Sequence, residues 1–126
     1  MKHYTTIEQS KKLLELGLSR DTADMVYQYN FLSKSNDTTP RAVNGSLHDT
    51  TLRNIPCWSL GALLEVMPKI KEFYYPSLYK DSYSVTACMY STQDHDIFKI
   101  YTGEDFLEAA YSMVIYLLEN GYIKDF

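Results

Sequence analysis

Two cysteines are the clearest candidates for nucleophilic chemistry in this sequence. Cys57 comes just before a segment expected to be helical, and a helix N-terminus can lower the pKa of a thiol toward its reactive form. Cys88 lies inside an alternating apolar segment that has no such feature. A small buried thiol explains both residues more simply, and cysteines without CxxC spacing are typical of free thiols in a reducing compartment.

Histidines stand next to carboxylates twice. His48 is followed by Asp49, a pair that could orient a general base, but no nucleophile lies at a useful spacing from it. Asp94, His95 and Asp96 are three potential ligands, yet they are consecutive, whereas a metal site needs ligands that converge from different parts of a fold. Such residues are common in polar turns. We therefore assign no catalytic residue, no metal ligand and no cofactor, and a small thiol- or His-dependent enzyme stays an alternative.

Tyrosine is unusually frequent, with twelve tyrosines against five phenylalanines and one tryptophan. A tyrosine ring combines apolar area with a polar hydroxyl, which suits half-buried sheet faces and protein interfaces. Several tyrosines are interleaved with Lys69, Lys71 and Lys80, an arrangement similar to the aromatic, basic grooves of single-strand nucleic-acid binders. The tryptophan is expected in the core or in the wall of a binding pocket. The candidate binding residues are Trp58, Tyr74, Tyr75, Tyr79 and Tyr83.

The overall charge argues against nucleic acid as the main partner. The chain has a formal net charge of -4 and a pI near 5.3, whereas a broad phosphate-binding surface needs clustered lysine and arginine. No glycine-rich phosphate loop, metalloprotease motif or hydrolase motif is present. The polar N-terminus and the lack of an apolar run of about 20 residues predict a cytoplasmic protein that does not engage a membrane.

Capping residues and apolar spacing predict helices near 5–16 and 59–67. Thr5 and Glu8 have the spacing of a capping box, and Gly17 can end the first helix in the left-handed conformation. Ser59 is a natural N-cap for the second helix. Gly61 costs that helix about 1 kcal/mol relative to alanine. Either close approach of another backbone or tolerance of glycine in a first turn would explain why glycine stands at this position.

A third and longer helix is expected near 103–119. Thr102 and Asp105 are spaced like a capping box, with aspartate in place of glutamate. The apolar residues that follow repeat at helical spacing along one broad face. Gly121 can end this helix, with Tyr122 folding back onto Leu117.

Alternation of side-chain type predicts strands near 25–32, 83–90 and 97–101. The last two are separated by a short polar turn and are expected to form an antiparallel hairpin. Residues 20–25 could instead extend as helix through Tyr29. Residues 33–54 are rich in Ser, Asn, Asp and Thr, which predicts a long polar loop and makes it the main candidate for mobility.

Three stretches resemble a known group of proteins. They are Leu13-Leu-Glu-Leu-Gly-Leu-Ser-Arg-Asp-Thr-Ala-Asp-Met25, the apolar stretch 55–68 from Ile55-Pro-Cys-Trp to Val-Met-Pro68, and the stretch 108–123 that ends in Asn-Gly-Tyr-Ile123. Together they resemble short uncharacterised proteins carried by prophages and mobile elements of gut Bacteroidetes. The resemblance implies a mobile-element accessory protein. It implies no activity and no catalytic residues.

These observations predict a single globular domain of the α+β class over residues 1–126. About three helices, the C-terminal one long, are expected to pack on a small, mainly antiparallel sheet of about three strands. The function expected first is non-enzymatic: an accessory protein that binds a protein partner or forms a homo-oligomer. A single-stranded nucleic-acid-binding module is the alternative from another class.

Overall fold

The computed structural model describes residues 2–43, 53–71, 73–81, 86–94 and 96–123. The described chain contains three α-helices, one short 3₁₀ turn and eight strands. In chain order they are α1 (Ile7–Glu15), the 3₁₀ turn η1 (Arg20–Thr22), β1 (Met25–Tyr27), β2 (Tyr29–Asn30), β3 (Ser35–Asn36), β4 (Arg41–Ala42), β5 (Ile55–Cys57), α2 (Leu60–Glu65), β6 (Tyr75–Lys80), β7 (Thr86–Ser91), β8 (Ile97–Gly103) and α3 (Phe106–Glu119).

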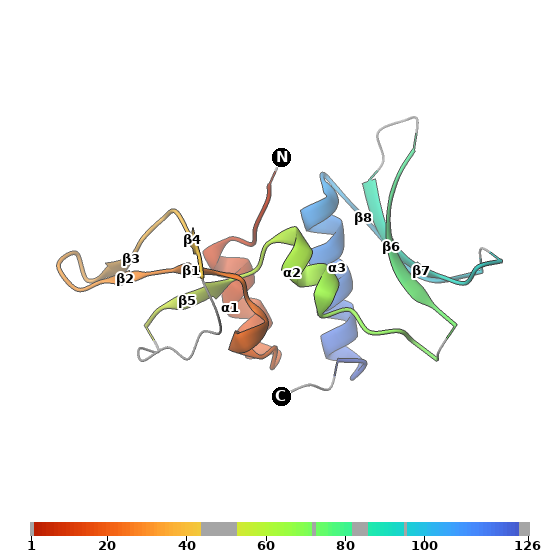
Figure 1. Ribbon diagram of the computed structural model, residues 1–126, viewed down its shortest axis with the longest axis horizontal. Helices are drawn as coiled ribbons and strands as arrows, with labels where there is room; N and C mark the ends of the chain where they lie inside the picture. Colours follow the sequence, from red (N-terminus) through yellow and green to blue (C-terminus); the bar gives the residue numbers. More distant parts are fainter. Residues whose placement is uncertain (1, 44–52, 72, 82–85, 95, 124–126) are drawn as a thin grey trace.

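The α+β class, the antiparallel pairing and the long C-terminal helix are confirmed. The helices lie in the middle of an elongated molecule, with β-structure at both ends (Figure 1). One end holds the sheet β4-β1-β5 and the small hairpin β2–β3, and the other end holds the sheet β6-β7-β8. α3 lies against β7 and β8.

The strands divide among three sheets rather than one. The expected strand near 25–32 is two short strands, and β1 pairs with β5 and β4 instead of with the expected hairpin. Its register sets Met25 opposite Cys57 and Val26 opposite Arg41. β3 and β4 both belong to the segment 33–54, which is therefore not entirely loop. Residues 44–52 of that segment lie outside the described residues, and the mobility expected of the loop stays a prediction.

Local signals account for most helix ends. Gly17 and Gly121 both have positive φ, at 99° and 74°. After α1 the backbone N–H of Leu18 donates to Leu13 O, and after α3 the N–H of Tyr122 donates to Leu117 O, at 3.0 and 2.9 Å. Both ends are thus the expected glycine-terminated turns, in which the residue after the glycine bonds back to the helix. Ser59 caps α2 as expected, through its hydroxyl and Ala62 N.

Two expected caps are shifted along the chain. The capping box of α1 uses Thr6 and Gln9, one residue later than predicted, with both reciprocal hydrogen bonds present. Thr5 is buried instead, and its hydroxyl oxygen accepts from the backbone N–H of Trp58 at 3.1 Å. At α3, Asp105 is the N-cap and accepts from Glu108 N at 3.0 Å. Thr102 remains in β8, because strand pairing with Ala87 keeps it extended.

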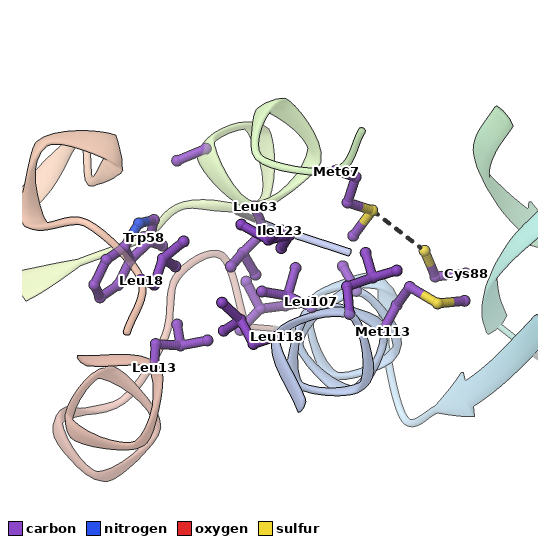
Figure 2. Packing of buried hydrophobic residues seen from close by; sticks show 14 of the residues in the cluster. Leu13, Leu18, Trp58, Leu63, Met67, Cys88, Leu107, Met113, Leu118 and Ile123 are labelled. Carbon is purple, nitrogen blue, oxygen red and sulfur yellow. Dashed lines mark hydrogen bonds between the residues drawn. The ribbon is translucent and has the colours of Figure 1, made fainter. Parts of the chain in front are cut away.

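A single hydrophobic cluster joins the three helices to the sheet β6-β7-β8. Figure 2 shows Leu13 of α1, Leu63 of α2 and Leu107 of α3 turned toward a shared interior, with Met113 between α3 and Cys88. All five side chains are fully buried. Side chains of this size stabilise the folded state by about 1.5–3 kcal/mol each when they leave water.

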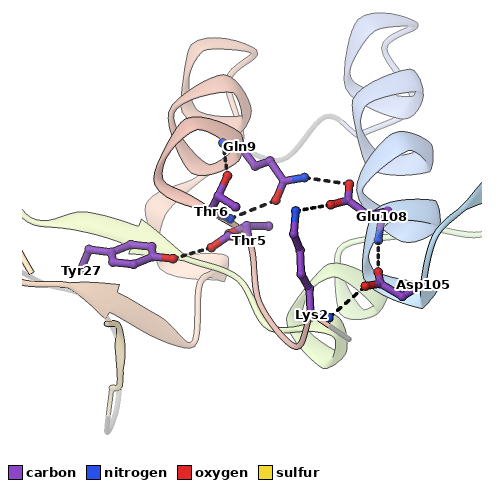
Figure 3. A network of polar contacts seen from close by, with 7 residues as sticks. All are labelled: Lys2, Thr5, Thr6, Gln9, Tyr27, Asp105 and Glu108. Atoms are coloured by element: carbon purple, nitrogen blue, oxygen red, sulfur yellow. Dashed lines mark hydrogen bonds and ion pairs between the residues drawn. The ribbon is translucent and has the colours of Figure 1, made fainter. Parts of the chain in front are cut away.

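Polar contacts fix the N-terminal segment to the start of α3 (Figure 3). The backbone N–H of Lys2 donates to Asp105 Oδ2 at 2.9 Å, and its ammonium pairs with Glu108. Gln9 of α1 also donates to Glu108, at 3.0 Å. Burial raises the pKa of the Asp105 carboxyl, but hydrogen bonds from two backbone N–H groups outweigh it and leave that pKa below its usual value. The network therefore holds the first turn of α3 in place.

The connection from β8 into α3 depends on Gly103. A Cβ atom there would lie 2.7 Å from Ala109 N and 2.9 Å from Glu108 Cβ, closer than any real contact of this kind. The carbonyl of Gly103 also accepts the hydroxyl of Thr86 from the neighbouring strand, at 2.6 Å. The absent side chain thus lets the end of the sheet approach the first turn of α3 closely.

Candidate functional site

The register of the sheet β6-β7-β8 assigns its side chains to two faces. Residues paired directly across neighbouring strands lie on the same face, and successive residues alternate. The pairs Tyr79–Ala87 and Ala87–Thr102 thus share one face, whereas Leu78–Cys88 and Cys88–Tyr101 share the other. We call the first the outer face; its members are Tyr75, Ser77 and Tyr79 of β6, Ala87, Met89 and Ser91 of β7, and Ile97, Ile100 and Thr102 of β8.

The inner face packs against the rest of the protein. Cys88 and Tyr90 are fully buried in the core cluster, and the Tyr90 hydroxyl donates to Pro68 O at 2.8 Å. The register shifts between Tyr90 and Ser91, whose partners in β8 are Lys99 and Ile97. The extra residue, Phe98, contacts the rings of Tyr74, Tyr116 and Tyr122 at centroid distances of 5.3–6.5 Å. The bulge therefore adds an aromatic ring to the covered side.

The outer face carries a group of exposed apolar side chains, although Ala87 between Tyr79 and Thr102 is buried. Among the described residues, seven large hydrophobic side chains are exposed, and four of them belong to this face: Tyr75, Tyr79, Ile97 and Ile100. A fifth, Phe73, lies two residues before the start of β6 and is 68% exposed. The remaining two, Phe31 and Leu32, are at the tip of the β2–β3 hairpin, at the other end of the molecule. Clustering on one face is informative, because single exposed hydrophobics are common on any surface.

Two adjoining depressions run along this side of the sheet. The larger has a volume of about 530 Å³ and is lined by Ser77, Tyr79, Met89 and Ile97 among others. The smaller, about 300 Å³, is lined by Phe73, Tyr75, Thr92, Gln93, Asp94 and Asp96. Thr92 and Gln93 line both. The site is therefore an open apolar groove with carboxylates at one end, and it is open rather than enclosed like an active-site cleft.

The turn that carries these carboxylates is held by hydrogen bonds. Thr92 N donates to Asp96 O at 2.9 Å, and Asp96 N donates to the Thr92 hydroxyl oxygen at 3.1 Å. Asp94 and Asp96 are both exposed. Within the described residues, no cation pairs with either carboxylate. The acidic end of the groove is thus a defined turn that carries two solvated negative charges.

The expected binding residues are distributed unequally. Tyr75 and Tyr79 lie on the outer face, as strand alternation requires, whereas Tyr74 turns to the inner side and packs on Phe98. Trp58 is fully buried and donates its indole N–H to the Thr22 hydroxyl oxygen at 2.9 Å, so no part of it is accessible to a partner. Tyr83 lies outside the described residues. Sequence reasoning missed Met89, Ile97 and Ile100 as members of the surface.

The thiols are poorly placed for chemistry. Cys57 and Cys88 are both free and fully buried. Burial raises the pKa of the Cys57 thiol to about 11, against hydrogen bonds that would lower it, and that of Cys88 to about 12. Cys57 Sγ donates to Thr5 O at 3.3 Å. Both groups are protonated at neutral pH, which is the reverse of what a thiol nucleophile needs.

His48, Asp49 and His95 lie outside the described residues. Among the residues that the structure does describe, no three His, Cys, Asp or Glu side chains are grouped to hold a metal ion. No helix in the described part of the chain is long and apolar enough to cross a membrane.

Comparison with known proteins gives no further guide to the site, because no family model, curated protein or solved structure matches this chain.

Proposed function

We propose that this chain is a non-enzymatic protein-interaction module that binds its partner through the outer face of β6-β7-β8. The observation that supports this most is the concentration of exposed Tyr75, Tyr79, Ile97 and Ile100 on a sheet face that α3 does not cover. Aromatic and aliphatic side chains of this kind form the central contacts of protein interfaces. The resemblance to prophage and mobile-element proteins supports the further proposal of an accessory role in such an element.

The nucleic-acid alternative receives less support from the same surface. Tyr74 and Tyr75 point to opposite faces, so the segment 69–80 does not present a continuous aromatic platform. The ammonium of Lys69 lies 5.2 Å from the centre of the Tyr75 ring, on an aromatic surface that a base would need for stacking. Asp94 and Asp96 stand at one end of the groove, where they would repel a phosphate backbone.

Site-specific photo-crosslinking in host cells tests the proposed surface. A benzophenone amino acid replaces Tyr79 on the outer face, and in a matched control it replaces Phe31 on the β2–β3 hairpin, where the native ring is also exposed. We expect a discrete protein adduct from position 79 that is absent from position 31. Adding Tyr75→Ser and Ile97→Ser should abolish the adduct, while circular dichroism shows an unchanged fold.

The outcomes separate the alternatives. An adduct between two copies of the chain, with a dimer mass in light scattering, would identify the partner as a second copy. Failure of position 79 to crosslink, or equal adducts from both positions, would refute the proposed surface. Salt-sensitive binding of labelled oligonucleotides that survives Tyr75→Ser and Ile97→Ser would favour the nucleic-acid alternative instead.

A further inference from the structure

The acidic end of the groove indicates what kind of partner the outer face accepts. We infer that the partner is a protein segment in which apolar side chains adjoin a lysine or arginine, with the cation placed between the Phe73 and Tyr75 rings and the carboxylates of Asp94 and Asp96. This inference rests on the proposed function and specifies the chemistry of its partner.

Charge complementarity is the first argument. Phe73 and Tyr75 share a depression of about 300 Å³ with Asp94 and Asp96. Aromatic faces attract cations through the ring quadrupole, and carboxylates attract them directly. The Lys69 ammonium, 5.2 Å from the centre of the Tyr75 ring, would repel an incoming cation, so the two carboxylates must supply most of the attraction. An anionic partner would meet two carboxylates, and an uncharged one would leave them in a partly desolvated site without a counter-charge.

The form of the groove supplies the second argument. The acidic depression continues into the larger one beside Tyr79, Met89 and Ile97, and Thr92 and Gln93 line both. A ligand with only a cation would fill the smaller depression and leave the apolar one exposed. A segment with apolar side chains next to its cation fills both, and the apolar contact would supply most of its affinity.

The edges of the sheet favour docking on the face over strand addition. β6 is an edge strand that contains Pro76, which has no N–H to offer a further strand. The other edge strand, β8, has its bulge at Phe98, opposite the step from Tyr90 to Ser91 in β7. Proline and bulges are both features that discourage edge-to-edge pairing. The partner segment is therefore expected to pack its side chains onto the outer face rather than to extend the sheet.

Selection from a random peptide library tests the inference. Twelve-residue peptides displayed on phage are selected against the intact chain, and the bound pool is challenged with the Tyr79→Ser/Ile97→Ser variant to retain peptides that need the outer face. We expect enrichment of lysine or arginine beside apolar residues. The Asp94→Asn/Asp96→Asn variant should bind the selected peptides about tenfold more weakly, which corresponds to about 1.4 kcal/mol. The charge-matched control Asp21→Asn/Asp37→Asn, which alters exposed residues elsewhere, should bind them unchanged.

Charge reversal makes the test stricter. Selection against Asp94→Lys/Asp96→Lys should enrich acidic residues in place of basic ones. Peptides that depend on Tyr79 and Ile97 but show no basic enrichment, and bind Asp94→Asn/Asp96→Asn normally, would overturn this inference and leave the proposed function standing. Failure to recover any peptide that depends on the outer face would overturn both. Equal loss of binding in the two Asp→Asn pairs would also overturn the inference, because the effect would then be one of net charge.

Discussion

Gly103→Ala should lower the free energy of unfolding by about 1–3 kcal/mol, because the new methyl group has no space. Its Cβ would lie 2.7 Å from Ala109 N, and ordinary van der Waals contact starts at 3.4 Å, so the strand and helix must separate by 0.7 Å. The nearest atoms include backbone of the first turn of α3, which cannot rotate away as a side chain could. The Thr86 hydroxyl that donates to Gly103 O would move with it.

Gly61→Ala is the matched control, with the same substitution and the opposite expected sign. Gly61 lies in the first turn of α2 and is exposed, and among the described residues its added Cβ would meet only Ser59 Oγ, at 3.7 Å. Of the two explanations that the sequence leaves open for this glycine, tolerance in a first turn is therefore the one consistent with the structure. Alanine is favoured over glycine by up to about 1 kcal/mol in a helix, so this variant should be equally or more stable than wild type.

Thermal and urea denaturation, each followed by tryptophan fluorescence, measure the stability of both variants. Trp58 is the only tryptophan and is fully buried, so its emission should report loss of the core. For a chain of this size each kcal/mol corresponds to about 4 °C in the melting temperature, so Gly103→Ala should melt about 4–12 °C below wild type. An unchanged midpoint for Gly103→Ala would refute the close approach of β8 to α3. Shifts of equal size and sign in the two variants would refute the distinction between the sites.

Three further predictions concern buried groups. Asp105→Asn should destabilise the protein at neutral pH, as measured by denaturation. Because the pKa of Asp105 is lowered in the folded state, the carboxylate contributes to stability above pH 3.8, its unfolded value, and this contribution is lost as the pH falls through the folded pKa. The denaturation curves of variant and wild type should therefore converge in acid. Tyr90→Phe should cost about 1–3 kcal/mol in urea denaturation by leaving the carbonyl of Pro68 without its hydroxyl donor, and a neutral effect would contradict that hydrogen bond. A chromogenic disulfide reagent at neutral pH should label Cys57 and Cys88 only as fast as the chain opens, whereas rapid labelling of native Cys57 would revive the thiol-enzyme alternative.

Helix ends were predictable from the sequence because the groups that form them are close along the chain. Gly17 and Gly121 needed only the residues beside them to bond back to the helix. The cap of α1 was predicted one residue early, because Thr5 and Thr6 each have a suitable residue three positions later. The choice between them is made by tertiary contacts: Thr5 is bonded to Trp58 and Ser10, residues that local spacing does not identify as its partners.

Strand pairing could not be predicted in this way. The strand near 25–32 was expected beside the C-terminal hairpin, but β1 pairs with β4 and β5, which lie in or beside a segment whose composition predicts a loop. β6 was not predicted at all, although it is six residues long and pairs with β7 along its whole length. Pro76 would not be tolerated in a central strand, but β6 lies at an edge of its sheet, where a missing N–H is tolerated. Strand pairing depends on contacts between residues that are distant in the sequence, and local patterns of residue type do not specify those contacts.

The candidate surface also depends on strand pairing, because the register decides which side chains share the outer face. The residue types on that face are those of a recognition surface. Tyr74, Tyr75 and Tyr79 stand close together in the sequence, but strand alternation turns Tyr74 to the inner side, against Phe98, and Tyr75 and Tyr79 to the outer face. An uncovered sheet face must stay hydrated while the chain is unbound, and tyrosine satisfies this with its hydroxyl while still offering a large apolar ring. Leucine or phenylalanine at these positions would raise the tendency to aggregate. A face that combines tyrosines with a few aliphatic side chains and ends in two carboxylates is therefore suited to exist both exposed and covered, as binding to a partner requires.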